Sequence, residues 1–152
     1  MTDIVTNRKA FRDFEISEKI EAGISLLGTE VKSIRQGRID LLGAFARVEK
    51  KEIFLYDATI QIYEQASHES HEPKRCRKLL LHKSEIERLT AHSLVKGRSL
   101  PALRMYWRHG RVKVEIGLGK GKHAADHRHD LKKKAVDREV KRAIANFERG
   151  KK

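Results

Sequence analysis

The sequence predicts a mainly β fold, a small closed antiparallel barrel with short flanking helices and a basic C-terminal tail. Three observations predict it. Residues 14–26 alternate between apolar and polar side chains, which is the pattern of a half-buried strand. Two pairs of further strand-like segments follow with short connections, and short connections join antiparallel strands. After Gly119 the strand pattern ends and the composition becomes strongly basic. An open sheet covered by helices is the competing architecture.

The first strand leads directly into a short helix. Between positions 14 and 26 the even positions are apolar except for Glu18, so Glu21 and Gly23 lie on the outward face. After Leu27 and Gly28, Thr29 is expected to cap a helix that ends at Gly37. Residues 38–44 are then expected to form a loop.

Two hairpins and a second helix make up the rest of the predicted barrel. Segments 44–49 and 52–57 are joined by Lys50 and Lys51, and because two lysines suit a tight two-residue turn poorly, a longer loop is expected there. Residues 58–63 extend the sheet, and the polar segment 64–78 forms a loop. Ser84 and Glu87 form a capping box that begins a helix ending at Gly97. Segments 103–107 and 112–118 form the second hairpin.

The chain divides into three predicted parts. Residues 1–12 form a polar N-terminal arm that is frayed in the free protein, or ordered against RNA. Residues 13–120 form the barrel. Residues 121–152 form the tail, which contains 11 basic and 5 acidic residues. This tail is predicted to be disordered when free and helical on binding, because a lone helix with many like charges and no buried face is marginal in water.

The charge of the chain indicates the class of its partner. A formal net charge of +13 over 152 residues favours binding to a polyanion through counterion release and long-range attraction. Nucleic acid is the expected partner. A membrane is not expected, because the sequence has no transmembrane-length apolar run and its first residues carry neither a signal nor a lipidation motif. The single cysteine excludes an internal disulfide and fits a cytoplasmic location.

Four short motifs have competing interpretations. GLGKGK at 117–122 resembles a phosphate-binding loop, but its glycine spacing is short and His123 replaces the final Ser or Thr. His123 and His127, with Asp126 nearby, have metal-ligand spacing on a helix, although solvated histidines are the expected state and no metal or other cofactor is predicted. Tyr106 and Trp107 are candidate stacking platforms, of which at least one is expected in the core. Glu21 is either a solvated carboxylate or an acceptor for base edges and 2′-hydroxyl groups.

Several segments together resemble a known family. Asn7-Arg8-Lys9-Ala10, EAGISLLGTEVKSIRQG at 21–37, RKLLLHK at 77–83 and GLGKGK followed by Asp126-His127-Arg128 are similar to the small protein B family. Members of that family are the protein partners of transfer-messenger RNA in bacterial trans-translation. The resemblance covers nearly the whole chain in order and spacing.

The resemblance implies an oligonucleotide-binding (OB-like) barrel and an RNA-binding adaptor rather than an enzyme. The barrel would hold the tRNA-like domain, and the tail would enter the decoding centre and messenger channel of a stalled ribosome for rescue and peptide tagging. Delivery would involve elongation factor Tu through the RNA, and the protein is expected to be a monomer. The implied RNA-binding residues are Asn7, Arg8, Lys9, Glu21, Gly23, Lys32, Arg35, Arg75, Arg77, Lys78, Leu80, Lys120 and Lys122. The implied ribosome-contacting residues are Asp126, His127, Arg128, Lys132, Lys133, Lys134, Arg138, Lys141 and Arg142.

The tail departs from the family pattern at two positions. His127 replaces the lysine of the usual Asp-Lys-Arg, and His123 stands where a lysine is common. A neutral histidine removes charge from a segment expected to contact ribosomal RNA. Two other functions compete with the adaptor: a metal-dependent nuclease built on His123, Asp126 and His127, and a general RNA chaperone on the same barrel.

Overall fold

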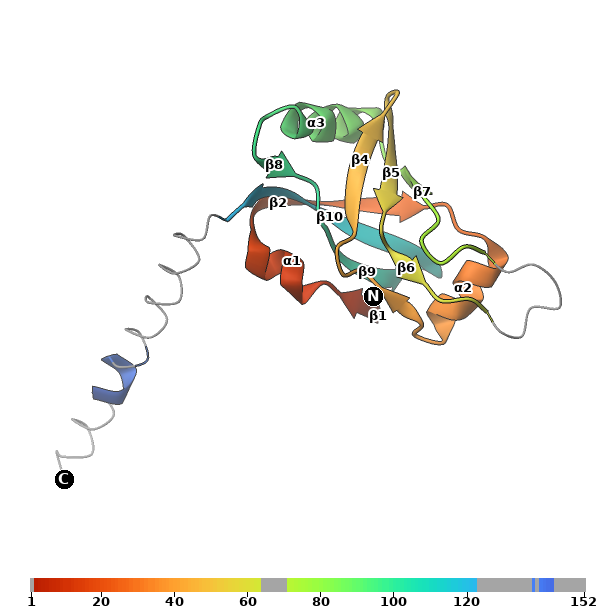
Figure 1. The fold of residues 1–152 in the computed structure, drawn as a ribbon, viewed down its shortest axis with the longest axis horizontal. Coiled ribbons are helices and arrows are strands. Elements are labelled where there is room, and N and C mark those ends of the chain that lie inside the picture. The colour runs from red at the N-terminus through yellow and green to blue at the C-terminus, as the bar shows by residue number, and fades with distance from the viewer. Residues whose placement is uncertain (1, 64–70, 123–137, 139, 144–152) are drawn as a thin grey trace. The chain divides into compact units, whose positions relative to one another are not determined.

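A computed structural model describes residues 2–63, 71–122, 138 and 140–143 (Figure 1). The chain divides into two units, residues 1–121 and 122–152. The first unit contains β1 (Thr2–Thr6), α1 (Arg8–Asp13), β2 (Phe14–Ile24), α2 (Gly28–Arg35), β3 (Ile39–Asp40), β4 (Phe45–Glu49), β5 (Glu52–Tyr56), β6 (Thr59–Ile60), β7 (Arg77–Leu80), α3 (Lys83–Ser93), β8 (Arg98–Ser99), β9 (Ala102–Arg108) and β10 (Arg111–Gly121).

All described strands except β3 and β6 form one large antiparallel sheet in the order β1-β9-β10-β2-β7-β5-β4, with β8 paired to β10. β4 is the last strand in this order, and it contacts the residues just before β9 at a single point. There Phe45 of β4 forms a bridge with Pro101, the Ala46 N–H donates to the Leu100 carbonyl at 2.7 Å, and the Ala102 N–H donates to the Ala44 carbonyl at 3.0 Å. The predicted mainly β fold with short helices is confirmed. Among the described strands the ladder is not closed, and this isolated bridge joins β4 to the residue before β9.

The core lies inside the curved sheet and explains the alternation in the sequence. Ile20 and Ala22 of β2 are buried, and they face buried residues from β9 and β10 such as Met105, Val114 and Ile116. Figure 1 shows α3 beside the β4–β5 hairpin and α2 beside β6. The buried side chains Leu89 and Ile34 anchor these two helices to the core.

Two glycines of the 117–122 motif, Gly117 and Gly119, serve packing. They lie in β10, where a Cβ on Gly117 would come within 3.0 Å of Leu103 Cδ1 and 3.1 Å of Ile16 Cδ1. Because no side chain fits there, glycine lets β9 and β2 pack closely against β10. This segment is a strand and does not form a phosphate-binding loop.

The predicted N-terminal arm is part of the fold. β1 pairs with the edge of β9, with Thr2 opposite Trp107 and Thr6 opposite Arg104. Asn7 then caps α1, as its side chain accepts from the Ala10 N–H at 3.2 Å. The expectation of a frayed arm is therefore wrong for residues 2–12, because an unpaired edge of β9 was available to bind them.

Three local predictions are also corrected. Lys50 and Lys51 form a two-residue turn, both with positive φ, and Glu49 pairs directly with Glu52. Residues 59–60 pair with β3 in a separate two-stranded sheet instead of extending the main one. Both helices begin two residues earlier than predicted, because α2 is capped at Leu27 rather than Thr29 and α3 is capped at His82 rather than Ser84. In each, a glutamate three residues on accepts from the cap N–H.

Candidate nucleic-acid interface

A groove of about 740 Å³ opens on the outer face of the sheet. Its walls come from the second half of β2, from α2, from β7 and the residues after it, and from the β9–β10 hairpin. Four of the predicted RNA-binding residues, Glu21, Gly23, Arg35 and Leu80, line this groove together. The structure thus brings together residues that are up to 59 positions apart in the sequence.

Glu21 presents a fixed, ionised carboxylate to the groove. Its Oε2 atom accepts a short hydrogen bond from the Tyr106 hydroxyl and a bond from Arg108 Nη1 at 2.9 Å. The Tyr106 bond lowers the pKa of Glu21; partial burial opposes this, and Arg108 and Lys113 lower the pKa further. The side chain remains 32% exposed, so the carboxylate can accept hydrogen bonds from a ligand.

Gly23 and Leu80 form an apolar patch beside this carboxylate. They face each other across β2 and β7, and a Cβ on Gly23 would lie 3.3 Å from Leu80 Cβ. Leu80 is 54% exposed although it belongs to a strand of the main sheet. A large exposed leucine next to bare backbone offers a flat surface that another molecule can approach closely.

Sequence reasoning missed two cations of the groove. Arg111 and Lys113 of β10 line the groove together with Glu21 and with Trp107 of β9, which was a candidate stacking platform. The two cations and Trp107 lie close to the turn of the predicted second hairpin. Because Arg111 and Lys113 alternate with the buried Val112 and Val114, the strand period directs both cations outward, and this was the sequence signal that could have identified them. Tyr106 is buried while Trp107 is only partly buried, in agreement with the expectation that at least one of them belongs to the core.

Arg77 is not an RNA-binding residue in this structure. Its side chain is fully buried, where Nε donates to Glu30 Oε2, and Nη1 and Nη2 donate to the carbonyls of Ala58 at 2.8 Å and Pro73 at 3.1 Å. Glu30 is also fully buried and accepts from Arg75 Nη2 at 2.6 Å. The prediction for Arg77 is wrong because this strand position faces inward, toward a carboxylate that the sequence did not reveal.

Asn7 also serves the fold. It is 6% exposed, and its Nδ2 donates to the carbonyls of Leu41 at 2.8 Å and Ala102 at 3.0 Å. With its Oδ1 already capping α1, the amide is fully engaged within the protein. The structure therefore replaces the predicted direct RNA contact of Asn7 with a positioning role for α1.

The other predicted RNA-binding cations are dispersed around the surface. Arg8, Lys9, Lys32, Lys78 and Lys120 are exposed, while Arg75 and Lys122 are partly buried. Lys32 lies over the Tyr63 ring at 5.4 Å, and Lys78 pairs with Glu52 at 3.2 Å. These residues are outside the groove lining, so any contact with RNA would be through phosphates around it.

The predicted tail contacts fall mostly outside the described residues. Arg138, Lys141 and Arg142 are helical and exposed, whereas Asp126, His127, Arg128, Lys132, Lys133 and Lys134 are not described. The metal-nuclease residues His123, Asp126 and His127 are likewise outside the described part of the chain. Within the described ranges, no three His, Cys, Asp or Glu side chains form a metal-binding group, and no helix there is long and apolar enough to cross a membrane.

Fold and groove together define a small antiparallel β protein with a groove in which Arg35, Arg111 and Lys113 accompany the ionised carboxylate of Glu21. Comparison with known proteins identifies the family: residues 4–146 match the family described as SmpB protein, and the chain belongs to that family. It is 49% identical over 141 residues to the SsrA-binding protein of Carboxydothermus hydrogenoformans, covering 93% of this chain and 95% of that protein. It is 50% identical over 139 residues to the SsrA-binding protein of Syntrophobacter fumaroxidans, covering 91% and 86%.

A solved structure has the same fold. It is described as "tmRNA-SmpB: a journey to the center of the bacterial ribosome" and aligns with a TM-score of 0.67 and 47% identity. The alignment covers 79% of this chain and 85% of that chain.

Proposed function

We propose that this protein is an RNA-binding adaptor of trans-translation, in which the groove around Glu21 binds the tRNA-like domain of transfer-messenger RNA. The observation that carries the proposal is the convergence of Glu21, Gly23, Arg35 and Leu80 in one groove, in a chain of the SmpB family. The protein acts by binding and is not an enzyme.

The groove suits recognition of a nucleotide better than simple attraction to phosphate. An ionised carboxylate repels phosphates, so Glu21 can approach RNA only where it meets a donor such as a base amino group or a 2′-hydroxyl. The surrounding Arg35, Arg111 and Lys113 supply the attraction to the backbone. Leu80 and Trp107 supply apolar surface for a base or ribose.

The second unit gives the adaptor its other partner. The basic tail, including Arg138, Lys141 and Arg142, binds the ribosome and its RNA in the decoding centre and messenger channel, with Asp126, His127, Arg128 and Lys132 to Lys134 in the same contact. Elongation factor Tu joins the complex through the RNA. The protein acts as a monomer in the cytoplasm, where the ribosome is.

The groove is tested by replacing its two central residues. Glu21→Ala is expected to weaken binding to the tRNA-like domain by roughly tenfold to a hundredfold, because hydrogen bonds to charged groups contribute about 1.5–3 kcal/mol. Leu80→Asp is also expected to weaken binding, because it replaces exposed apolar surface of the groove with a carboxylate that repels RNA phosphates. Affinity is measured by gel shift against a labelled tRNA-like domain. The control is Glu87→Ala, which removes an exposed carboxylate of α3 that lies outside the groove. Unchanged affinity in both groove variants would refute the proposed function.

The salt dependence of binding tests the electrostatic part. If 6 to 10 phosphates are contacted, affinity should fall by roughly 10³- to 10⁵-fold between 50 and 200 mM salt. Lys113→Ala should reduce the slope of log affinity against log salt by about one unit. A slope that stays near zero for the unmodified protein would contradict phosphate binding. A general RNA chaperone would instead show equal affinity for an unstructured RNA of the same length.

A further inference from the structure

A second cavity lies on a different part of the barrel from the groove. It has a volume of about 560 Å³ and is lined by α1, the start of β2, β4 and residues 98–101. This volume is within the range of small-molecule sites, roughly 300–1,000 Å³. The cavity and the groove share no lining residue. Along β2 they are seven residue steps apart, from Phe14 to Glu21, which is roughly 23 Å of extended chain.

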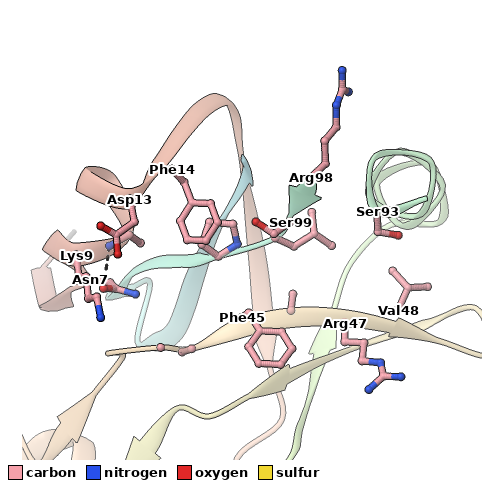
Figure 2. Close-up of a pocket in the computed structure, with 16 residues that line it drawn as sticks. Asn7, Lys9, Asp13, Phe14, Phe45, Arg47, Val48, Ser93, Arg98 and Ser99 are labelled. Carbon is pink, nitrogen blue, oxygen red and sulfur yellow. Dashed lines mark hydrogen bonds between the residues drawn. The ribbon is translucent and has the colours of Figure 1, made fainter. Parts of the chain in front are cut away.

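The walls of this cavity are suited to a planar ring. Figure 2 shows the Phe14 ring and the Ser99 side chain on one side and the Phe45 ring on the other. Phe45 is 37% exposed and is held in place by stacking on Tyr56, with the ring centroids 5.7 Å apart. An aromatic side chain that is fixed yet exposed is a platform on which a nucleic acid base can stack.

One polar atom in the wall lacks a partner. The Ser99 hydroxyl oxygen is buried, and among the described residues no side chain or backbone group bonds to it. A buried hydroxyl without a hydrogen bond is unfavourable, and this one belongs to a residue that lines the cavity. Because the oxygen itself has almost no exposed surface, it can bond to the edge of a base or a 2′-hydroxyl in the cavity only after the Ser99 side chain turns toward it.

The charge around the cavity fits an anionic backbone. Lys9, Arg47 and Arg98 line it against the single carboxylate of Asp13, and Asp13 already pairs with Arg12 at 3.3 Å. Figure 2 shows the guanidinium groups of Arg47 and Arg98 extending away from the aromatic rings. A base between the rings would thus leave its phosphates outside, next to these cations.

The cavity adjoins the strand that leads into the tail. Phe14 pairs with Gly121, and Arg98 pairs with Lys120, so the last residues of β10 run beside the cavity wall. A partner that binds the chain where β10 ends, at Lys120 and Gly121, would therefore lie next to the cavity, whereas the groove lies along the other half of β2.

From these observations we propose that the cavity binds one unstacked nucleotide of ribosomal RNA, with its base between Phe14 and Phe45. This inference rests on the proposed function, because it assigns the ribosome as the second partner. It adds a base-binding site on the barrel itself to the contacts of the tail.

The test compares ribosome binding with tRNA-like RNA binding in the full-length protein. Phe45→Leu, which keeps the bulk but removes the aromatic face, and Arg98→Glu should each weaken binding to purified ribosomes by roughly tenfold to a hundredfold. Both should leave affinity for the tRNA-like domain within about twofold. Phe45→Tyr should retain ribosome binding, which separates stacking from folding. Lys96→Glu is the matched charge control, since Lys96 is exposed two residues from Arg98 and lines neither site.

A photoreactive phenylalanine at position 45 identifies the occupant. In complexes with transfer-messenger RNA and ribosomes it should cross-link to ribosomal RNA. Cross-linking to transfer-messenger RNA or to protein, or equal ribosome affinity of Phe45→Leu and the unmodified chain, would overturn the inference. If Glu21→Ala also left tRNA-like binding unchanged, the proposed function would fail as well. If Glu21→Ala weakened binding to the tRNA-like domain as expected while Phe45→Leu left ribosome affinity unchanged, only the proposed second site would be refuted.

Discussion

The ionised state of Glu21 depends first on the Tyr106 hydroxyl, which donates a hydrogen bond to Oε2. Tyr106→Phe removes this bond and should raise the pKa of Glu21 toward its ordinary 4.5. Because a lowered carboxyl pKa stabilises the fold above that ordinary value and the contribution disappears as pH falls through the lowered pKa, the variant should lose stability mainly above pH 4.5. Carbon NMR titration of the Glu21 carboxyl measures the shift.

Tyr56→Phe is the control for this measurement. Its hydroxyl bonds to Glu49 at another part of the sheet, so the titration of Glu21 should be unaffected. Equal titration of Glu21 in the unmodified protein and in Tyr106→Phe would show that Arg108 and Lys113 alone determine its pKa.

Replacing the buried Glu30 should have a much larger effect on the free energy of unfolding. Burial alone would raise the pKa of Glu30, but hydrogen bonds from Arg75, the Leu27 N–H and Arg77 lower it overall. Glu30→Gln leaves the Arg77 charge buried without its counter-ion and should cost about 3–5 kcal/mol in the free energy of unfolding. Urea denaturation measures this. Glu52→Gln, which breaks an exposed pair with Lys78, should change stability by less than about 1 kcal/mol.

A double variant separates the charge from the packing. Glu30→Met with Arg77→Leu removes both charges and should recover part of the stability lost in Glu30→Gln. If the double variant were less stable than the single one, the bonds from Arg77 to the Ala58 and Pro73 carbonyls would be the larger contribution.

At the residue scale, the sequence predicted side chains well where the strand period decided their direction. Glu21 and Leu80 were placed outward from alternation and resemblance, and both line the groove. The predicted RNA contacts of Arg77 and Asn7 do not match the structure, because long-range partners bury both side chains. Arg77 is held by Glu30, and Asn7 is held by the Leu41 and Ala102 carbonyls. Such partners lie 34 to 95 positions away, so local pattern carries no signal for them.

At the scale of elements, the two hairpins show how tertiary pairing overrides turn chemistry. The β9–β10 turn uses His109 and Gly110, both with positive φ, which suits its two-residue loop. The β4–β5 turn adopts the same conformation with Lys50 and Lys51. The sequence predicted the first turn and missed the second, because strand pairing through Glu49 and Glu52 imposes a left-handed conformation that lysine does not favour.

This turn can be improved. Lys51→Gly should stabilise the protein by about 1 kcal/mol, because glycine adopts a φ of +64° without the Cβ clash. Thermal and urea denaturation measure the gain. Lys51→Ala removes the same charge but keeps a Cβ, so it should show no such gain. Equal stabilisation by both substitutions would assign the effect to charge instead of backbone conformation.

At the scale of the whole molecule, the division of the chain after Gly121 separates the groove proposed for the tRNA-like domain from the tail proposed to contact the ribosome. β10 is complete at Gly121, whose N–H donates to the Gly97 carbonyl at 3.3 Å, and the groove and its supporting network lie entirely before this point. A chain ending at Lys122 should therefore unfold within a few degrees of the full-length protein. Its affinity for the tRNA-like domain should fall only modestly, in proportion to the lost positive charge.

The same shortened chain should not support peptide tagging on stalled ribosomes. Arg138→Glu with Lys141→Glu in the full-length protein is the companion variant, because both side chains are exposed and helical and their reversal leaves the barrel unchanged. Gel shift with the tRNA-like domain and a tagging assay are run on the same preparations. If the double reversal reduced both activities equally, the tail would belong to the RNA-binding surface of the barrel. If tagging persisted in the shortened chain, the ribosomal function would lie within residues 1–122, where the cavity between Phe14 and Phe45 would be the first candidate.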